Sequence, residues 1–194
     1  MSNHLHYKIY KPYGMLSQFS PEAGHAVLGD LMTFRKDVYP VGRLDADSEG
    51  MLILSSDPGL TNRLLDPSNA HWRTYYAQVE GIPDEKALEK LKQSVEIKVN
   101  GESYRTLPCK VEIIDEPTLP ERNPPIRERK SIPTTWLKMD LREGKNRQVR
   151  KMTAAVGFPT LRLVRWSIGK LEMGEMRSGE VKELTFEDLK LLFA

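Results

Sequence analysis

The chain has 194 residues with a net charge of +2; 39% of the residues are hydrophobic and 29% are charged, an ordinary composition for a folded globular protein. Its apolar runs are far shorter than the ~20 residues of a membrane helix, and its first ten residues lack the apolar core of a secretory signal. Disordered, membrane-spanning and exported proteins are thereby disfavoured, and we expect a cytoplasmic protein with no membrane contact. One cysteine, Cys109, and four scattered histidines provide no disulfide framework and no ligand spacing, so we expect no metal.

Hydrophobic periodicity predicts strands and helices along the whole chain. In chain order, the expected strands lie at 6–10, 51–55, 71–81, 96–99, 107–114, 134–141 and 161–166. The expected helices lie near 27–31, at 59–65 and 83–94, between a cap at Asn146 and a closing Gly157, and from Thr185 onward. Most of these elements are short and separated by Pro/Gly turns, which indicates an α+β fold with a mainly antiparallel sheet.

Capping and turn residues mark the ends of several elements. Asp57 before Pro58 is typical of an N-cap with proline in the first turn, and Thr185 with Asp188 forms a capping box. Asn100-Gly101 supplies turn chemistry between the strands at 96–99 and 107–114. The residues expected to point inward from the last helix are Phe186, Leu189 and Leu192.

One acid-rich stretch precedes a buried strand. It reads Gly42-Arg43-Leu44-Asp45-Ala46-Asp47-Ser48-Glu49-Gly50 and is followed at once by the apolar residues of 51–54. A carboxylate such as Asp45 would therefore stand at the mouth of a core strand. The stretch can also be a solvated turn, since most aspartates are exposed, and the residues of this segment alone leave both interpretations open.

The basic residues are concentrated in one third of the chain. Twelve Lys or Arg lie between Arg122 and Arg165 against three acidic residues, and the remainder of the chain is acidic. This distribution indicates an anionic partner such as nucleic acid, or else a solvated basic face. Within it, Arg147, Arg150 and Lys151 share one face of a predicted helix, which suits phosphates or a buried carboxylate. The proline-rich loop at 115–133 is a candidate arm over that partner.

Four motifs, in order, resemble those of one enzyme family. The stretch from Gly42 to Leu52 is similar to the GRLDxxSEGLL signature of the RsuA branch of pseudouridine synthases. The segments at 11–14, 73–75 and 143–152 resemble the KPxG, K-x-Y and EGxxRQVRxM motifs of that branch, with Arg73 where Lys is usual. Segments 123–134 and 157–163 are most similar to a branch member that acts on the large ribosomal subunit.

The resemblance implies a fold and a domain organisation. The fold would be the family's mixed, mainly antiparallel sheet with flanking helices, in two lobes around a central cleft. Residues 1–194 would form a single catalytic domain with no N-terminal S4 RNA-binding domain.

The resemblance also implies an activity and roles for named residues. The protein would isomerise one uridine of 23S ribosomal RNA to pseudouridine, as a monomer and without a cofactor, nucleotide or metal. Asp45 would be the essential carboxylate, Tyr75 would stack on the target base, and Arg150 would pair with Asp45, which then stays ionised. Arg43 would fill the space left by the extruded nucleotide. The remaining expected RNA contacts are Arg127, Arg129, Lys130, Arg147, Lys151, Arg162 and Arg165.

The sequence leaves one alternative activity open. A non-catalytic protein that binds ribosomal RNA or assists ribosome assembly could use the same basic third, although it would not need Asp45, Tyr75 and Arg150 together. Neither the modified uridine nor the chemical route taken by Asp45 can be deduced from these residues.

Overall fold

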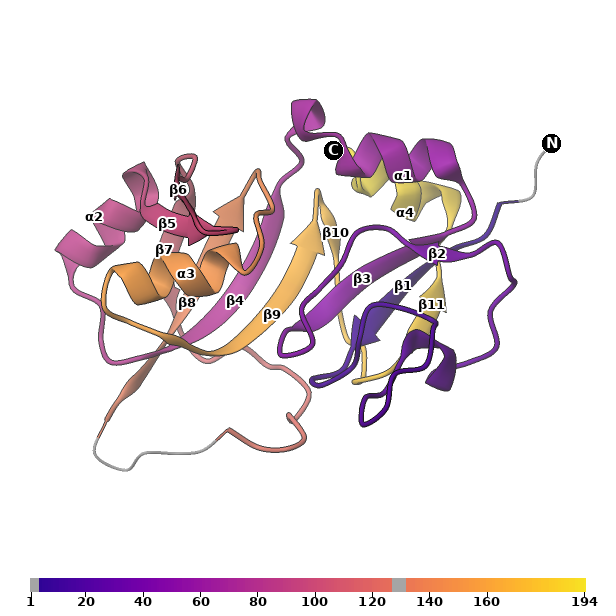
Figure 1. Cartoon of the computed structure of the whole chain (residues 1–194), viewed down its shortest axis with the longest axis horizontal. Helices are drawn as coiled ribbons and strands as arrows, with labels where there is room; N and C mark the ends of the chain where they lie inside the picture. The colour runs from indigo at the N-terminus through magenta and orange to yellow at the C-terminus, as the bar shows by residue number, and fades with distance from the viewer. Residues whose placement is uncertain (1–3, 127–131) are drawn as a thin grey trace. The chain divides into compact units, whose positions relative to one another are not determined.

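The computed structural model describes residues 4–126 and 132–194, and its chain forms two compact units of strands and helices (Figure 1). Unit 1 comprises Met1–His71, Pro120–Pro124 and Arg165–Ala194, and unit 2 comprises Trp72–Leu119 and Pro125–Val164. The predicted α+β class with a mainly antiparallel sheet is confirmed. None of the helices in the described ranges is long and apolar enough to cross a bilayer. The organisation as a single catalytic domain stays a prediction.

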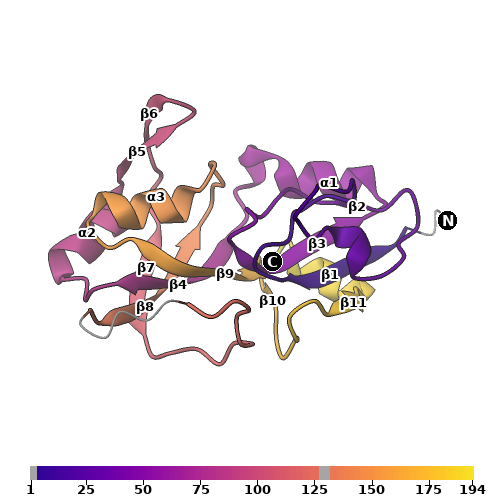
Figure 2. The same cartoon turned by 60° about the horizontal axis from the view of Figure 1, so that its bottom comes forward.

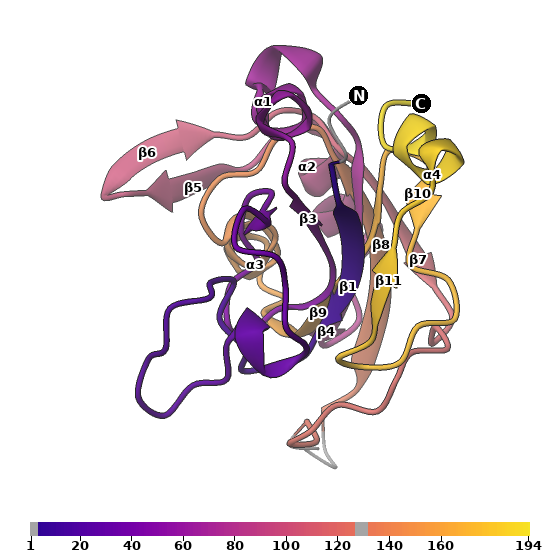
Figure 3. The same ribbon diagram turned by 90° about the vertical axis from the view of Figure 1, so that its right-hand side faces the viewer.

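Unit 1 is built around a fully buried strand. Every residue of β3 (Glu49–Ser55) is buried, as expected of the apolar run that follows the acid-rich stretch. Strand β1 (His6–Lys11) lies between β3 and β11 (Val181–Glu183) and is antiparallel to both (Figure 3). The unit also contains η1 (Leu28–Asp30), β2 (Tyr39–Pro40), α1 (Pro58–Leu65), η2 (Pro67–Asn69), the end of β9 (Thr160–Ile168), β10 (Leu171–Glu172) and α4 (Phe186–Leu191).

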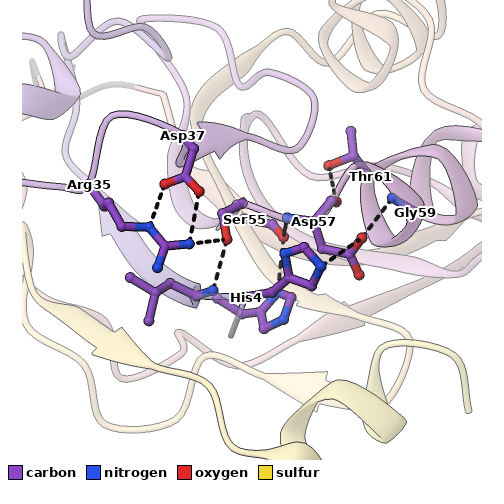
Figure 4. Close-up of polar contacts among 10 residues, drawn as sticks. His4, Arg35, Asp37, Ser55, Asp57, Gly59 and Thr61 are labelled. Atoms are coloured by element: carbon purple, nitrogen blue, oxygen red, sulfur yellow. Dashed lines mark hydrogen bonds and ion pairs between the residues drawn. The ribbon is translucent and has the colours of Figure 1, made fainter. Parts of the chain in front are cut away.

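A polar network fixes the far end of β3 (Figure 4). The Ser55 hydroxyl accepts a hydrogen bond from the Asp57 N–H and contacts the His6 ring, both at 2.9 Å. The Ser56 hydroxyl accepts from the Leu5 N–H at 2.9 Å and from the Arg35 guanidinium at 3.1 Å. Because these bonds join the strand to the N-terminal segment and to the cap of α1, β3 is a rigid support for the loop at its other end.

Unit 2 has a sheet with one face packed against helices. Its strand order is β9-β4-β8-β7, from β4 (Arg73–Glu80), β8 (Thr134–Leu141), β7 (Lys110–Ile114) and the first residues of β9. Alternate residues of these strands form one buried cluster with residues of α2 (Glu85–Gln93) and α3 (Gln148–Ala155) and with Ile97. A separate hairpin of β5 (Glu96–Val99) and β6 (Glu102–Arg105) stands out from this sheet (Figure 2).

Several local predictions are confirmed. Asp57 caps α1 through the Gly59 N–H, and the helix expected over 83–94 is α2, which begins after Asp84, whose side chain accepts from the Ala87 N–H. Thr185 and Asp188 form the predicted capping box. Gly157 closes the segment after α3 with a φ of +96°, a conformation that glycine adopts without strain. Cys109 is a buried free thiol, as expected of a small core residue.

Other local predictions are wrong. The strand that pairs with β5 is β6, directly after the Asn100-Gly101 turn, and β6 was not predicted; the predicted strand over 107–114 is present as β7 but pairs with β8. Asn146 does not cap α3, because the N-cap is Arg147, which is in the left-handed conformation with φ +53°. Phe186 is 72% exposed instead of pointing inward, whereas Leu192 is buried. The short strands β2, β10 and β11 lie in segments where alternation was too brief to predict a strand.

Candidate active site

The loop that carries Asp45 enters the start of β3 between two glycines with positive φ. Gly42 has a φ of +75° and Gly50 has a φ of +102°. A Cβ atom at Gly42 would also come within 3.1 Å of the Leu65 side chain. Leu44 packs into the core of unit 1, while Asp45 is half-buried. The glycines allow sharp bends on both sides, so the loop presents Asp45 beside an immobile strand.

Hydrogen bonds hold the backbone on both sides of Asp45. The Ser17 hydroxyl donates to the Leu44 carbonyl at 2.8 Å and accepts from the Leu44 N–H at 3.0 Å. The Gly14 N–H donates to the Ala46 carbonyl at 2.7 Å, and the Ser48 N–H donates to the Asp45 carbonyl at 3.0 Å. The position of the Asp45 main chain is therefore determined by contacts with residues 14 and 17, which precede the loop, and by one contact within the loop.

A buried lysine lies against the same loop. Lys11 has no exposed surface, and its Nζ donates to the carbonyls of Met15 at 2.7 Å, Pro12 at 2.9 Å and Ala46 at 3.4 Å. Burial lowers the pKa of Lys11 to about 8, although the carboxylates of Glu49, Asp47 and Asp45 favour the charged form. In the sequence Lys11 stands out only as part of a motif, and no signal near Ser17 indicates its contact with Leu44.

Replacing Lys11 with methionine should change how stability depends on pH. The folded pKa is about 8, below the usual 10.5, so the unfolded chain binds more protons between these values and stability rises with pH. Below pH 8 both states carry the charge, and its burial opposes folding by about 3 kcal/mol. We expect the stability of the wild type, relative to Lys11→Met, to increase by about this amount from pH 8 to 10.5 in urea denaturation.

The exposed Lys98 provides the control for this measurement. Lys98→Met removes one cation without touching the buried site, so its stability relative to the wild type should stay constant across the same pH range. If the free energies of unfolding of the wild type and of Lys11→Met changed in parallel with pH, the inference that Lys11 carries a buried charge would be contradicted.

The segment before α3 is fixed by a single carboxylate in unit 2. Glu143 accepts hydrogen bonds from the Tyr104 hydroxyl at 2.5 Å, the Leu107 N–H at 2.7 Å and the Gln148 side chain at 2.6 Å. The first of these bonds is the main reason that the pKa of Tyr104 is raised to about 12. Gln148 also accepts from the Lys145 N–H at 2.9 Å. Glu143 thereby sets where α3 begins and how it is oriented.

Unit 2 brings Tyr75 close to the helix that carries Arg150. Tyr75 on β4 is 8% exposed and belongs to the same buried cluster as Val149 and Met152 of α3. Arg150 is half-buried and its Nη1 donates to the Thr160 carbonyl at 3.2 Å. Asp45 belongs to unit 1, so the assembly of Asp45 with Tyr75 and Arg150 stays a prediction.

The expected RNA contacts that lie among the described residues differ in their exposure to solvent. Arg43 and Arg147 are exposed, and Lys151 is partly exposed with its Nζ 3.2 Å from the Asn146 side chain. Arg127, Arg129 and Lys130 lie outside the described residues.

Arg162 and Arg165 are only 8% and 6% exposed, so neither lies on the surface that was expected to contact phosphate. The Nε of Arg165 donates to the Met51 carbonyl at 2.8 Å, a contact that supports the start of β3. The residue types along this strand do not indicate which of its arginines point inward.

The described residues contain no group of three His, Cys, Asp or Glu side chains that could hold a metal ion. The groups gathered at the Asp45 loop are a carboxylate, a buried ammonium and backbone amides. The ammonium and the amides already donate to main-chain carbonyls, so their part is to position the loop that carries Asp45.

Comparison of the sequence and fold with known proteins finds a matching family, similar curated proteins and a similar solved structure. The family model described as RNA pseudouridylate synthase matches residues 6–155. The chain is 51% identical over 174 residues to ribosomal large subunit pseudouridine synthase E of Vibrio parahaemolyticus, covering 90% of this chain and 71% of that protein. It is 50% identical over 175 residues to the Vibrio vulnificus protein of the same name, covering 90% and 73%. A crystal structure of a pseudouridylate synthase matches its fold with a TM-score of 0.80 at 22% identity, covering 99% of this chain and 75% of that one.

Proposed function

The chain belongs to the RNA pseudouridylate synthase family, and we propose that it converts one specific uridine of 23S ribosomal RNA to pseudouridine, with Asp45 as the essential carboxylate. The family resemblance recognised from the four motifs is confirmed, and with it the assignment as an RNA pseudouridine synthase, an isomerase. The names of the relatives at 51% and 50% identity support ribosomal RNA of the large subunit as the substrate.

The reaction rearranges atoms without oxidation or hydrolysis. The bond between N1 of uracil and C1′ of ribose breaks, the base turns, and C5 bonds to C1′. The proton on C5 is released and N1 gains a proton, so the product is an isomer of the substrate. Asp45 could attack C1′, add to C6 of the base or assist elimination to a glycal, and each route needs an ionised carboxylate held at a defined position.

The observation that carries the proposal is the immobilised loop around Asp45. Hydrogen bonds to Leu44, Asp45 and Ala46 fix the main chain on both sides of the carboxylate. In a solvated turn, water would satisfy the main-chain groups. Here the Ser17 hydroxyl both donates to and accepts from the Leu44 main chain, and the buried Lys11 ammonium donates to the Ala46 carbonyl. Holding a reacting group in place lowers the entropy cost of reaching the transition state, which is what a catalytic carboxylate requires.

The other site residues have complementary roles in the proposal. Arg150 pairs with Asp45 and keeps it ionised and oriented, and Tyr75 stacks on the target base. A base within an RNA helix is unreachable, so the target nucleotide is flipped out at a cost of a few kcal/mol. Arg43, which is exposed on the Asp45 loop, fills the space that this nucleotide leaves.

In this proposal, cations of the basic third of the chain supply the sequence-independent part of RNA binding. Arg147 and Lys151 contact phosphates near α3, and the loop with Arg127, Arg129 and Lys130 contributes further contacts. In this proposal the protein acts in the cytoplasm as a monomer, and residues 1–194 form one catalytic domain.

The proposal is tested by tritium release from 23S ribosomal RNA labelled at C5 of uracil. We expect the wild-type protein to release one tritium per RNA molecule, because one C5 proton is lost at one modified uridine. Mapping pseudouridine in the treated RNA then identifies the position. Binding of the RNA without tritium release, on naked RNA and on ribosomal assembly intermediates alike, would overturn the proposal and favour a non-catalytic ribosomal RNA-binding protein.

A further inference from the structure

Two cations of unit 2 share one tryptophan. The Lys110 Nζ lies 4.7 Å from the centre of the Trp72 ring, and the Arg142 guanidinium lies 4.3 Å from it. Both basic side chains belong to exposed residues, while Trp72 is half-buried. An indole attracts cations through its quadrupole, so Trp72 holds two positive charges in a small area of surface. We call these three residues the Trp72 platform.

The two cations of the Trp72 platform have no carboxylate partner among the described residues. The nearest acid in the strand register is Asp140, which is directly opposite Lys110. The Asp140 carboxylate accepts a hydrogen bond from the Thr74 hydroxyl at 2.7 Å and keeps its negative charge. Two cations therefore lie beside one carboxylate, and the remaining positive charge favours an anionic ligand.

Two other cations that lie over aromatic rings, Lys190 and Lys145, have an acid nearby, whereas Arg63 lies as a single cation 3.7 Å from the ring centre of Phe193. Lys190 lies 4.5 Å from the ring centre of Phe186 and also pairs with Glu187 at 2.8 Å. Lys145 lies 4.7 Å from the ring centre of Tyr104, whose hydroxyl donates to Glu143. The Trp72 platform differs from these sites because it holds two cations, neither of which has an ion pair within the described ranges.

The Trp72 platform lies at one end of the sheet in unit 2. Arg73 of β4 is paired with Leu141 of β8, so Trp72 and Arg142 are neighbours just beyond the paired ends of these strands. Side chains alternate along a strand, so the platform faces away from the buried cluster that contains Tyr75. Arg142 begins the connection from β8 to α3, which leads around the end of the sheet (Figure 1).

We propose that Trp72, Lys110 and Arg142 bind the phosphate backbone of the substrate RNA. A strand of RNA that leaves the region of α3 can follow residues 142–147 around the end of the sheet to reach the platform. Lys110 and Arg142 contact phosphates there, and Trp72 keeps the two side chains in place. The inference rests on the proposed function only in taking the substrate to be RNA.

Phosphodiester is the anion that this arrangement fits best. Backbone contacts by Lys and Arg release counterions and are independent of base sequence, which suits a surface outside the active site. The Vibrio relatives are named as pseudouridine synthases of the large ribosomal subunit, and the RNA substrate proposed above is such a polyanion.

The test compares RNA affinity across salt concentrations for the full chain and its variants. Lys110→Gln with Arg142→Gln removes the platform's charges, and both positions are exposed enough to accept glutamine. We expect RNA affinity to fall about tenfold at moderate salt, and the slope of log K against log salt to decrease by about 1.5 to 2. Trp72→Leu should weaken binding less, since the charges remain.

The control removes two cations that already have acid partners. Lys182 pairs with Glu180 at 3.2 Å and Lys190 pairs with Glu187 at 2.8 Å, so Lys182→Gln with Lys190→Gln makes the same change in net charge. We expect this variant to keep the wild-type salt slope. Fluorescence anisotropy with a labelled fragment of 23S ribosomal RNA, and with single-stranded RNA of unrelated sequence, measures both effects.

Each outcome separates this inference from the proposed function. If the Lys110/Arg142 variant keeps the wild-type affinity and slope while the wild type releases tritium, the platform does not bind RNA and the function stands. If the wild type releases no tritium, the proposed function is wrong. The salt slopes of the wild type and the variant then still show whether the platform binds RNA. Unchanged RNA binding together with lost binding to polyglutamate would assign the platform to an acidic polypeptide and overturn the inference.

Discussion

Asp45→Asn should abolish pseudouridine formation while leaving the fold intact. The substitution keeps the size of the side chain and the hydrogen bonds of the loop main chain, but it removes the ionised carboxylate. Because every route considered for the reaction needs that carboxylate, we expect the rate of tritium release to fall by about 10⁴-fold or more. Single-turnover assays with C5-tritiated RNA measure the loss directly, and RNA affinity should remain within about threefold of the wild type, since phosphate contacts dominate it.

Asp47→Asn is the matched control, because Asp47 lies in the same loop and undergoes the same chemical change. We expect this variant to retain activity within about tenfold of the wild type, since changes outside the reacting groups have modest effects. Equal losses in the two variants would show that the loop is sensitive to any loss of charge. If Asp45→Asn released tritium at the wild-type rate, Asp45 would not be the essential carboxylate.

Substitution of Arg150 should have the second-largest effect on catalysis. Arg150→Met removes the cation proposed to orient Asp45, so we expect kcat to fall by about 10²- to 10³-fold with a smaller change in KM. Arg150→Lys keeps the charge but loses the planar guanidinium, which can bind a carboxylate with two hydrogen bonds. Its kcat should therefore lie between those of Arg150→Met and the wild type. Single-turnover tritium release at saturating enzyme measures kcat apart from RNA binding.

Two controls separate this effect from structural damage. Arg150 also donates to the Thr160 carbonyl, so the thermal stability of each variant must be measured alongside its activity. Lys151→Met removes a neighbouring cation of the same helix, and it should raise KM more than it lowers kcat. A kcat for Arg150→Met equal to that of the wild type would contradict the proposed pairing with Asp45.

Local chemistry explains which parts of the fold were predictable. Asp57, Asp84 and Thr185 cap helices as their residue types favour, because a cap depends on a hydrogen bond to a main-chain N–H two or three residues away. The alternation that predicts the strand at 134–141 reflects its buried face, which carries Leu137, Met139 and Leu141. Arg147 is the exception, because a left-handed N-cap has no reliable signal in the residue type.

Two predictions failed for different reasons. The partner of β5 was misassigned although the signal is local: Asn100-Gly101 forms a two-residue hairpin turn, so the residues directly after it, Glu102–Arg105, pair with β5. Phe186 was expected to be buried from its spacing, yet its side chain is exposed because no element covers that position in the described part of the chain.

For the candidate site, the sequence alone determined the residue types and their order: an aspartate between two glycines before a buried strand, a strand tyrosine, and a helix with three cations. These features depend on neighbours along the chain, so they are visible without coordinates. Only the tertiary structure showed that Lys11 and Ser17 hold the Asp45 loop, that Arg162 and Arg165 are buried, and that Trp72 gathers two cations. Burial and contact between distant residues depend on which strands pair and which faces pack, and those choices are made by the whole fold rather than by any one segment.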